Sequence, residues 1–89
     1  MSAISVQVTY RNGRPFAAYI YLAHAAGAGT ARTEEVTSDL LIDYAADGTP
    51  LGIEIISPGF VTEQEINMVF DRLGLTRPSA ADLAPLRAA

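Results

Sequence analysis

The acidic residues in the middle of the chain are the first candidates for chemistry. Glu34 and Glu35 lie in one strand-like segment, and Asp43 and Glu54 lie in two others. Carboxylates that converge on one face of a sheet can hold a hard cation, or can act as the acid and the base of a hydrolase. Strands also carry such side chains simply because one face meets water. We expect this second role, and therefore neither a metal site nor a catalytic residue.

Glu54 has the most distinctive surroundings of the four carboxylates. It lies between two isoleucines and two residues after Gly52, whose bare backbone allows a neighbouring ring or backbone to approach closely. A cross-strand pair with Arg32 would explain this carboxylate without any catalytic role. The candidate polar-face site therefore comprises Asp43, Glu54, Arg32 and Gly52. The alternative is that these carboxylates bind a metal or act in acid–base catalysis.

Other residue types that commonly catalyse reactions are scarce. His24 is the only histidine and is expected in a solvated loop at a strand end. The chain contains no cysteine, which excludes disulfides, thiolate zinc sites and cysteine nucleophiles. The serines lack the context of a nucleophile elbow, and residues 27–29 lack the lysine of a phosphate-binding loop. The sequence predicts a protein that is not an enzyme and needs no cofactor.

A β-hairpin over residues 40–56 is expected to position Asp43, Gly52 and Glu54. Asp47-Gly48 separates two β-type runs and suits the positive φ angles of a two-residue type I′ turn. With this loop length, three apolar cross-strand pairs share one face, and the acidic residues occupy the other face. The three pairs are Tyr44 with Leu51, Ile42 with Ile53, and Leu40 with Ile55.

Another hairpin and an edge strand are expected before residue 40. Residues 4–10 alternate between apolar and polar side chains, as a half-buried strand does. Asn12-Gly13 supplies a turn, and residues 16–22 form a strand that is apolar on both faces. Residues 31–36 are rich in charge, which is typical of a short strand at the edge of a sheet.

The period of the apolar residues changes after Pro58-Gly59. Apolar side chains then recur at i, i+3, i+4 and i+7, which defines one face of an amphipathic helix. Thr62 is the expected N-cap, and Glu65 completes a capping box. Gly74 suits the position after the last turn. The helical face is built from Ile66, Val69, Phe70 and Leu73.

The last residues combine a helix-start signal with a helix breaker. Ser79 and Asp82 have the spacing of a second capping box, but Pro85 interrupts the segment. Residues 77–89 are therefore either a short docked helix or a loose tail. The expected fold class is α+β, in a single domain over residues 1–76. It is a mainly antiparallel sheet of four to five strands, made of two β-hairpins, with one C-terminal amphipathic helix packed on a face.

Composition places the chain among soluble globular domains. Its 89 residues fit one domain, and the apolar share of 49% with a charged share of 18% suits neither disorder nor a membrane span. No basic segment followed by an apolar run marks a signal peptide, so a cytoplasmic location is expected. The net charge of −4 argues against direct nucleic-acid binding and suits a small basic protein as partner.

The strand at residues 16–22 predicts self-association. Both of its faces are apolar, whereas the chain offers one amphipathic helix to cover them. Tyr19 and Tyr21 would stay exposed, with Val6 and Val8 beside them if the first turn has two residues. Such a patch favours a homodimer. Alternatively, the segment 77–89 folds over this face and the chain is a monomer.

Three segments carry a resemblance to a known family. They are YIYL at 19–22, ARTEEV at 31–36, and a hairpin in which LIDY at 41–44 leads through Asp47-Gly48 to GIEII at 52–56. Over about residues 10–57 the chain resembles the domain of unknown function 2283 family, small prokaryotic proteins of largely uncharacterised role. The first turn departs from the pattern, because residues 11–15, RNGRP, replace the family's usual acidic residues.

The resemblance implies a small uncharacterised protein. In their genomic setting, members of this family are similar to small antitoxin-like partners of ribonuclease-type toxins, and the resemblance implies the same for this chain. The expected function is non-catalytic protein interaction, in its specific form an antitoxin-like role toward a basic toxin. A small ligand-binding domain, or an enzyme that uses the carboxylates and tyrosines of the sheet, is the alternative.

Overall fold

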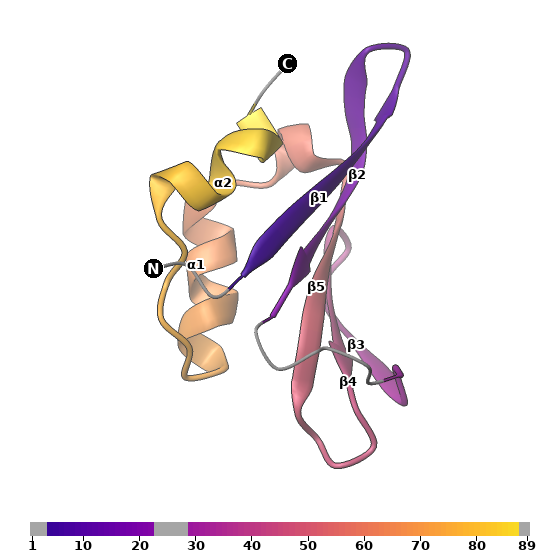
Figure 1. Cartoon of the computed structure of the whole chain (residues 1–89), viewed down its shortest axis with the longest axis vertical. Helices are drawn as coiled ribbons and strands as arrows, with labels where there is room; N and C mark the ends of the chain where they lie inside the picture. Colours follow the sequence, from indigo (N-terminus) through magenta and orange to yellow (C-terminus); the bar gives the residue numbers. More distant parts are fainter. Residues whose placement is uncertain (1–3, 23–28, 88–89) are drawn as a thin grey trace.

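The computed structural model describes residues 4–22 and 29–87 and has the predicted α+β architecture. Five antiparallel strands form one sheet in the order β1-β2-β5-β4-β3, and both α-helices lie on the same side of it (Figure 1). The elements are β1 (Ser5–Arg11), β2 (Arg14–Tyr21), β3 (Arg32–Thr37), β4 (Leu40–Tyr44), β5 (Pro50–Ile56), the 3-10 turn η1 (Pro58–Phe60), α1 (Glu63–Arg72) and α2 (Ala80–Arg87). The central strand β5 thus joins the two halves of the sheet.

The first hairpin closes with the predicted two-residue turn. Asn12 and Gly13 both have positive φ angles, 53° and 74°, as a type I′ turn requires. Shortly after the turn, a β-bulge leaves Phe16 without a partner on β1. The bulge shifts the register of β1 against β2 by one residue.

This bulge overturns part of the predicted interface. Val6 pairs with Ile20, and both Val6 and Val8 pack against the core beneath the helices. Tyr19 pairs instead with Gln7. A shift of one residue exchanges the two faces of a strand, so the valines and the tyrosines lie on opposite faces of the sheet.

The turn of the hairpin between β4 and β5 is one residue longer than predicted. Gly48 has the expected positive φ, 90°, but Asp47 does not share it, so the turn is not type I′. The N–H of Gly48 donates to the carbonyl of Ala45 at 3.0 Å, and the N–H of Ala45 donates to the carbonyl of Thr49 at 2.8 Å. The loop therefore consists of residues 46–48, a three-residue arrangement common in hairpins.

A bulge at Leu51 compensates for the longer loop. Tyr44 pairs with Pro50 rather than with Leu51, which corrects the predicted pair nearest the turn. Beyond the bulge the register returns to the predicted one, so the apolar and acidic faces of this hairpin are as expected. The restored apolar pairs are Ile42 with Ile53 and Leu40 with Ile55.

Strand β3 lies at the edge of the sheet, as its charge predicts. It pairs with β4 through a short turn in which the N–H of Asp39 donates to the hydroxyl of Thr37 at 3.1 Å. This third hairpin is absent from the prediction of two. A turn made by residues 37–39 without glycine carries a weaker sequence signal than Asn-Gly or Asp-Gly.

Helix α1 begins and ends on the predicted signals. The N–H of Glu65 donates to the hydroxyl of Thr62, and the N–H of Thr62 donates to the carboxylate of Glu65, at 3.1 and 3.0 Å. At the other end Gly74 has a φ of 71°, and its N–H donates to the carbonyl of Asp71. This left-handed residue closes the helix.

A second helix, α2, corrects the prediction of one C-terminal helix. Ser79 and Asp82 form the second capping box, with bonds of 2.9 and 3.1 Å. The helix continues through Pro85, although an internal proline costs about 3 kcal/mol. Leu83 and Leu86 on either side of it are each only 3% exposed. Their burial contributes about 1.5–3 kcal/mol each, which offsets the proline.

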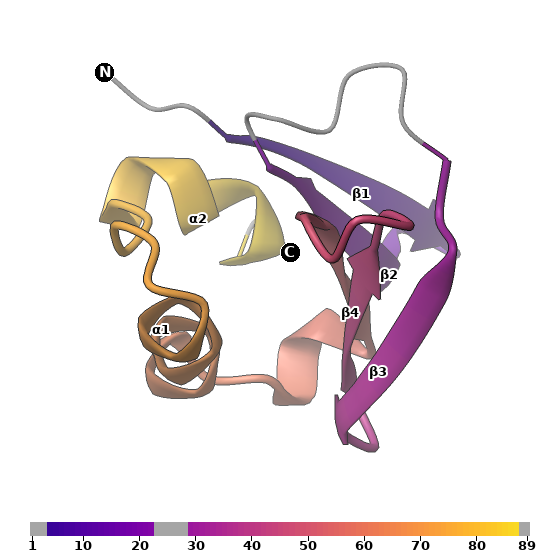
Figure 2. The same ribbon diagram turned by 90° about the horizontal axis from the view of Figure 1, so that it is seen from below.

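The hydrophobic core lies between the sheet and the two helices. Helix α2 packs toward β1 on the helix-covered face, so it does not cover the tyrosines of β2 (Figure 2). Within residues 4–22 and 29–87, no helix has the length and apolar character needed to cross a membrane. The large side chains that are almost fully enclosed are Ile20, Leu40, Ile42, Ile53, Ile55, Pro58, Ile66, Val69 and Phe70.

Candidate functional site

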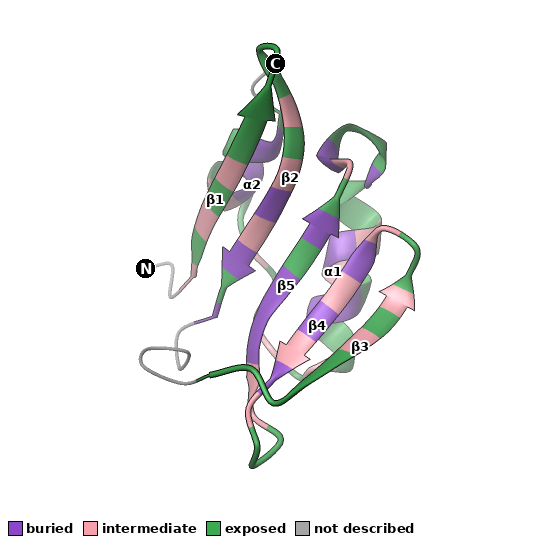
Figure 3. Cartoon of the chain, turned by 90° about the vertical axis from the view of Figure 1, so that its right-hand side faces the viewer, coloured by how far each residue is buried: buried purple, intermediate pink, exposed green. Residues whose placement is uncertain are grey.

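The other side of the sheet carries most of the candidate site residues. No described helix lies over this side, which is turned toward the viewer in Figure 3. Cross-strand pairing places Tyr19 beside Glu54, and places Gly52 between Tyr21 and Asp43. We call this side the open face; its main residues are Gln7, Thr9, Phe16, Ala17, Tyr19, Tyr21, Leu41, Asp43, Gly52, Glu54 and Ile56.

Gly52 is needed because an aromatic ring lies across it. A Cβ atom at this position would overlap the ring of Tyr19, which extends from β2 over β5. The sequence predicted such a close approach without identifying the ring. With no side chain in the way, the hydroxyl of Tyr19 donates to Asp43 of β4 at 2.8 Å. One phenol therefore connects three adjacent strands.

Asp43 has both carboxylate oxygens occupied by hydroxyl donors. Tyr19 donates to one oxygen, and Thr33 of β3 donates to the other at 2.6 Å. Burial and the hydrogen bond to this carboxylate raise the pKa of the Tyr19 phenol well above its usual value of 10. Tyr19 is thus a protonated donor at neutral pH, and the arrangement suits stabilisation of the sheet.

Tyr21 extends this polar network to the outer strand β1. Its hydroxyl donates to the side-chain carbonyl of Gln7 at 2.9 Å. Its ring lies 4.6 Å from the ring of Tyr19, centroid to centroid, at an interplanar angle of 57°. Such tilted pairs stabilise the face beyond the area that they bury.

Arg32 lies on the helix-covered face, which corrects its assignment to the polar-face site. It pairs with Tyr44 across β3 and β4, and its guanidinium lies 4.1 Å from the centroid of the Tyr44 ring. Its neighbour Thr33 is the residue of β3 that reaches the open face. Because adjacent residues of a strand point to opposite faces, Arg32 does not pair with Glu54.

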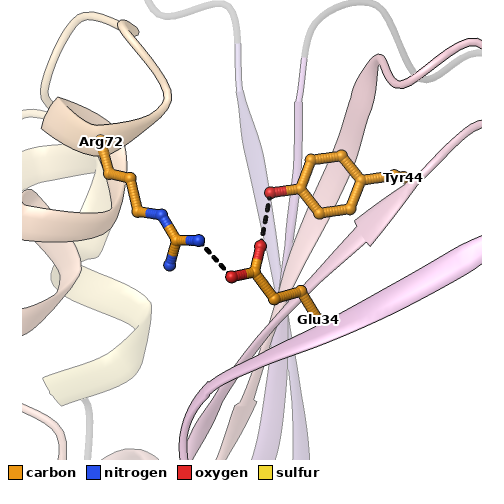
Figure 4. Close-up of polar contacts among 3 residues, drawn as sticks. All are labelled: Glu34, Tyr44 and Arg72. Carbon is orange, nitrogen blue, oxygen red and sulfur yellow. Dashed lines mark hydrogen bonds and ion pairs between the residues drawn. The ribbon is translucent and has the colours of Figure 1, made fainter.

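Glu34 also lies on the helix-covered face, apart from the other three carboxylates. Its carboxylate accepts a hydrogen bond from the hydroxyl of Tyr44 at 2.9 Å and forms an ion pair with Arg72 of α1 (Figure 4). The Arg72 and Tyr44 donors hold the pKa of Glu34 below its usual value of 4.5. Glu34 therefore does not join the other three carboxylates on the open face, and it instead links the edge strand to the helix.

A groove of about 460 Å³ crosses β1, β2 and β5 on the open face. Glu54 and Gln7 contribute polar atoms to it, and the larger part of its lining is apolar. The apolar lining includes Phe16, Tyr19 and Ile56. A groove with one carboxylate and two aromatic rings can accept a cationic side chain.

The described residues form no set of ligands for a metal ion. Within residues 4–22 and 29–87, no three His, Asp or Glu side chains gather closely enough to hold a metal ion. Asp43 and Glu54 lie on the open face but belong to different cross-strand pairs. The solvated position predicted for His24 lies outside the described residues.

Sequence reasoning missed two exposed apolar residues of the open face, Phe16 and Ile56. Strict alternation places Phe16 with Ala18 on the helix-covered face, and the bulge in β2 moves it to the other side. The position of Ile56 could have been predicted, because Ile56 follows Glu54 by two residues and alternation places both on the polar face. Both residues line the groove.

Comparison with known families confirms the resemblance seen in the strands. Residues 17–57 match the family described as Protein of unknown function (DUF2283). The match runs from within β2 to just past the end of β5 and includes Tyr19, Asp43, Gly52 and Glu54. Comparisons with curated proteins and with solved structures gave no significant match. Over residues 17–57, the chain therefore matches the DUF2283 family of proteins of unknown function.

Proposed function

We propose that this protein is a non-catalytic protein-interaction module that binds its partner through the open face. One observation carries the proposal: three large apolar side chains remain exposed on a sheet face that no described helix covers. Phe16, Tyr21 and Ile56 are 48%, 43% and 41% exposed. Aromatic residues clustered with aliphatic ones, and bordered by polar groups, are typical of protein interfaces.

The charge of the open face toward β5, β4 and β3 favours a basic partner. Asp43 and Glu54 lie on this face, and Glu35 of β3 lies opposite Leu41 at its edge. The whole chain has a net charge of −4. An antitoxin-like role toward a small basic toxin, in the cytoplasm, is the specific form of this proposal that the family resemblance implies.

Asp43 and Tyr19 give little support to the enzymatic form of the alternative, a small ligand-binding domain or an enzyme that uses the carboxylates and tyrosines of the sheet. A catalytic base needs a free carboxylate or an ionisable phenol near neutral pH. Asp43 already accepts two hydroxyl hydrogen bonds, and the pKa of Tyr19 is raised. These features favour a rigid surface over a reactive one.

Affinity purification of the tagged full chain from its source cells tests the proposal. Ile56→Glu places a charge in the exposed apolar part of the open face, and we expect it to lose the bound partner. Met68→Glu is the matched control, because Met68 is an exposed apolar residue on α1, away from the open face. Retention of every bound protein by Ile56→Glu would contradict the proposal.

A further inference from the structure

Two charged side chains of opposite sign stand unpaired on the open face. Glu54 is exposed on β5 and makes no hydrogen bond or ion pair with another described residue. Arg14 is exposed at the start of β2 and likewise has no such partner within residues 4–22 and 29–87. It lies opposite Arg11 across the first hairpin, so positive charge gathers at this end of the sheet.

The two charges lie at opposite ends of one stretch of strand β2. Glu54 is the cross-strand neighbour of Tyr19, five residues after Arg14. At roughly 3.3 Å per residue, Arg14 and Tyr19 are about 16 Å apart along the strand. The middle of this stretch falls at Phe16 and Ala17.

The surface around this midpoint is apolar. Phe16 and Ile56 are exposed there, and the small residue Ala17 pairs with Ile56 on β5. The guanidinium of Arg11 covers one side of the Phe16 ring, at 4.2 Å from the centroid. An apolar centre with charged groups at its border is the usual anatomy of a protein interface.

This pattern is self-complementary. A two-fold axis can lie in the plane of the interface, perpendicular to the strands, and pass through Phe16. Rotation about this axis places the open face of a second copy against the open face of the first. The rotation places the positive end of each copy over the negative end of the other, and places the two apolar centres against one another. A two-fold contact requires this reciprocity, and a patch of a single sign would not satisfy it.

We infer that the open face binds a second copy of this chain, with Arg14 of each protomer in the groove beside Glu54 of the other. Tyr19 and Glu54 line the same groove, so an entering guanidinium meets an aromatic ring and a carboxylate together. The inference rests on the proposed function, and it identifies a second copy of the chain as the partner that binds the β1–β2 end of the open face. Asp43 and Glu35 lie toward β4 and β3, outside this contact.

Charge reversal with sedimentation equilibrium at micromolar concentration tests the inference on the full chain. We expect the unmodified protein to have twice the 9.4 kDa mass of one chain. Arg14→Glu and Glu54→Arg should each weaken the dimer at least about tenfold, because like charges then face one another. The double variant should restore the affinity to within about threefold, because the reversed pair attracts again.

Two controls separate the contact from general effects of charge and folding. Arg14→Glu and Glu54→Arg change the net charge in opposite directions, so a non-specific charge effect cannot weaken both dimers. Glu35→Arg makes the same change as Glu54→Arg outside the proposed contact, and should leave the dimer intact. Urea denaturation checks that each variant folds.

Three outcomes overturn the inference. The first is a monomer for the unmodified chain, and the second is a dimer that neither single reversal weakens. The third is a double variant that stays as weak as the single ones. In each case the proposed function still stands if Ile56→Glu loses a different protein in the affinity purification. It fails separately if that variant retains every partner.

Discussion

At the scale of single residues, Gly52 and Tyr19 form the most specific contact of the open face. Gly52→Ala adds a methyl group where the Tyr19 ring lies, so the ring must leave its hydrogen bond to Asp43. We expect the free energy of unfolding, measured in urea, to fall by about 1–3 kcal/mol. In a Tyr19→Ala background the same substitution should be neutral or stabilising, because alanine suits a strand better than glycine does. An equal loss in both backgrounds would show that the ring is not the cause.

Glu34 makes the stability of the fold depend on pH. Its pKa is lower in the folded chain than in the unfolded chain, so the ionised carboxylate stabilises the fold above its usual pKa of 4.5. This stabilisation is lost as the pH falls through the lower pKa of the folded state. We therefore expect Glu34→Gln to be less stable than the unmodified protein at neutral pH, and the difference in urea midpoint to shrink as the pH falls below 4.5 and through the lower pKa of the folded state.

The neighbouring residue provides the control for this pH dependence. Glu35→Gln removes a carboxylate from the same strand, but from the side that faces away from Arg72. Its difference from the unmodified protein should change little over the same range of pH. If Glu34→Gln and Glu35→Gln behave alike, the contact with Arg72 and Tyr44 does not contribute measurably to folding.

At the scale of elements, helix α1 depends on its capping box. Thr62→Ala removes the hydroxyl that accepts the N–H of Glu65, and should lower the free energy of unfolding by about 0.5–2 kcal/mol. Thr62→Ser keeps the hydroxyl and should lie within a few tenths of a kcal/mol of the unmodified protein. Thermal unfolding followed by circular dichroism measures both variants. A similar loss for serine would point to the methyl group of the threonine instead of the cap.

At the scale of the whole molecule, α2 completes the core of a small domain. A chain of 89 residues has only a small hydrophobic core, and Leu83 is one of the residues buried in it. Leu83→Ala should therefore destabilise the fold by about 2–5 kcal/mol in urea denaturation. Met68→Ala truncates an exposed apolar side chain and should stay within about 0.5 kcal/mol. Equal effects would mean that α2 is not part of the cooperative unit.

The features that sequence predicted correctly are those with local causes. The positive φ angles of Asn12, Gly13 and Gly48, the caps at Thr62 and Gly74, and the edge position of β3 all follow from residue types within a few positions. The apolar face of the hairpin between β4 and β5 also follows from alternation. The extra loop residue and the bulge at Leu51 cancel there, so the register beyond the bulge is the predicted one. No such cancellation occurs in the first hairpin.

By itself, then, the sequence determined the α+β class, the positions of the Asn12-Gly13 and Asp47-Gly48 turns, the start of α1 and the family resemblance of residues 17–57. Only the tertiary structure decided which side chains share the open face. The bulge at Phe16 placed Val6 and Val8 on the side of the helices, and pairing with Tyr44 and Ile42 of β4 placed Arg32 and Glu34 on the same side. A one-residue shift leaves the composition and the local signals of a strand almost unchanged. It reverses the face of every residue beyond it, so the surface is set by long-range pairing.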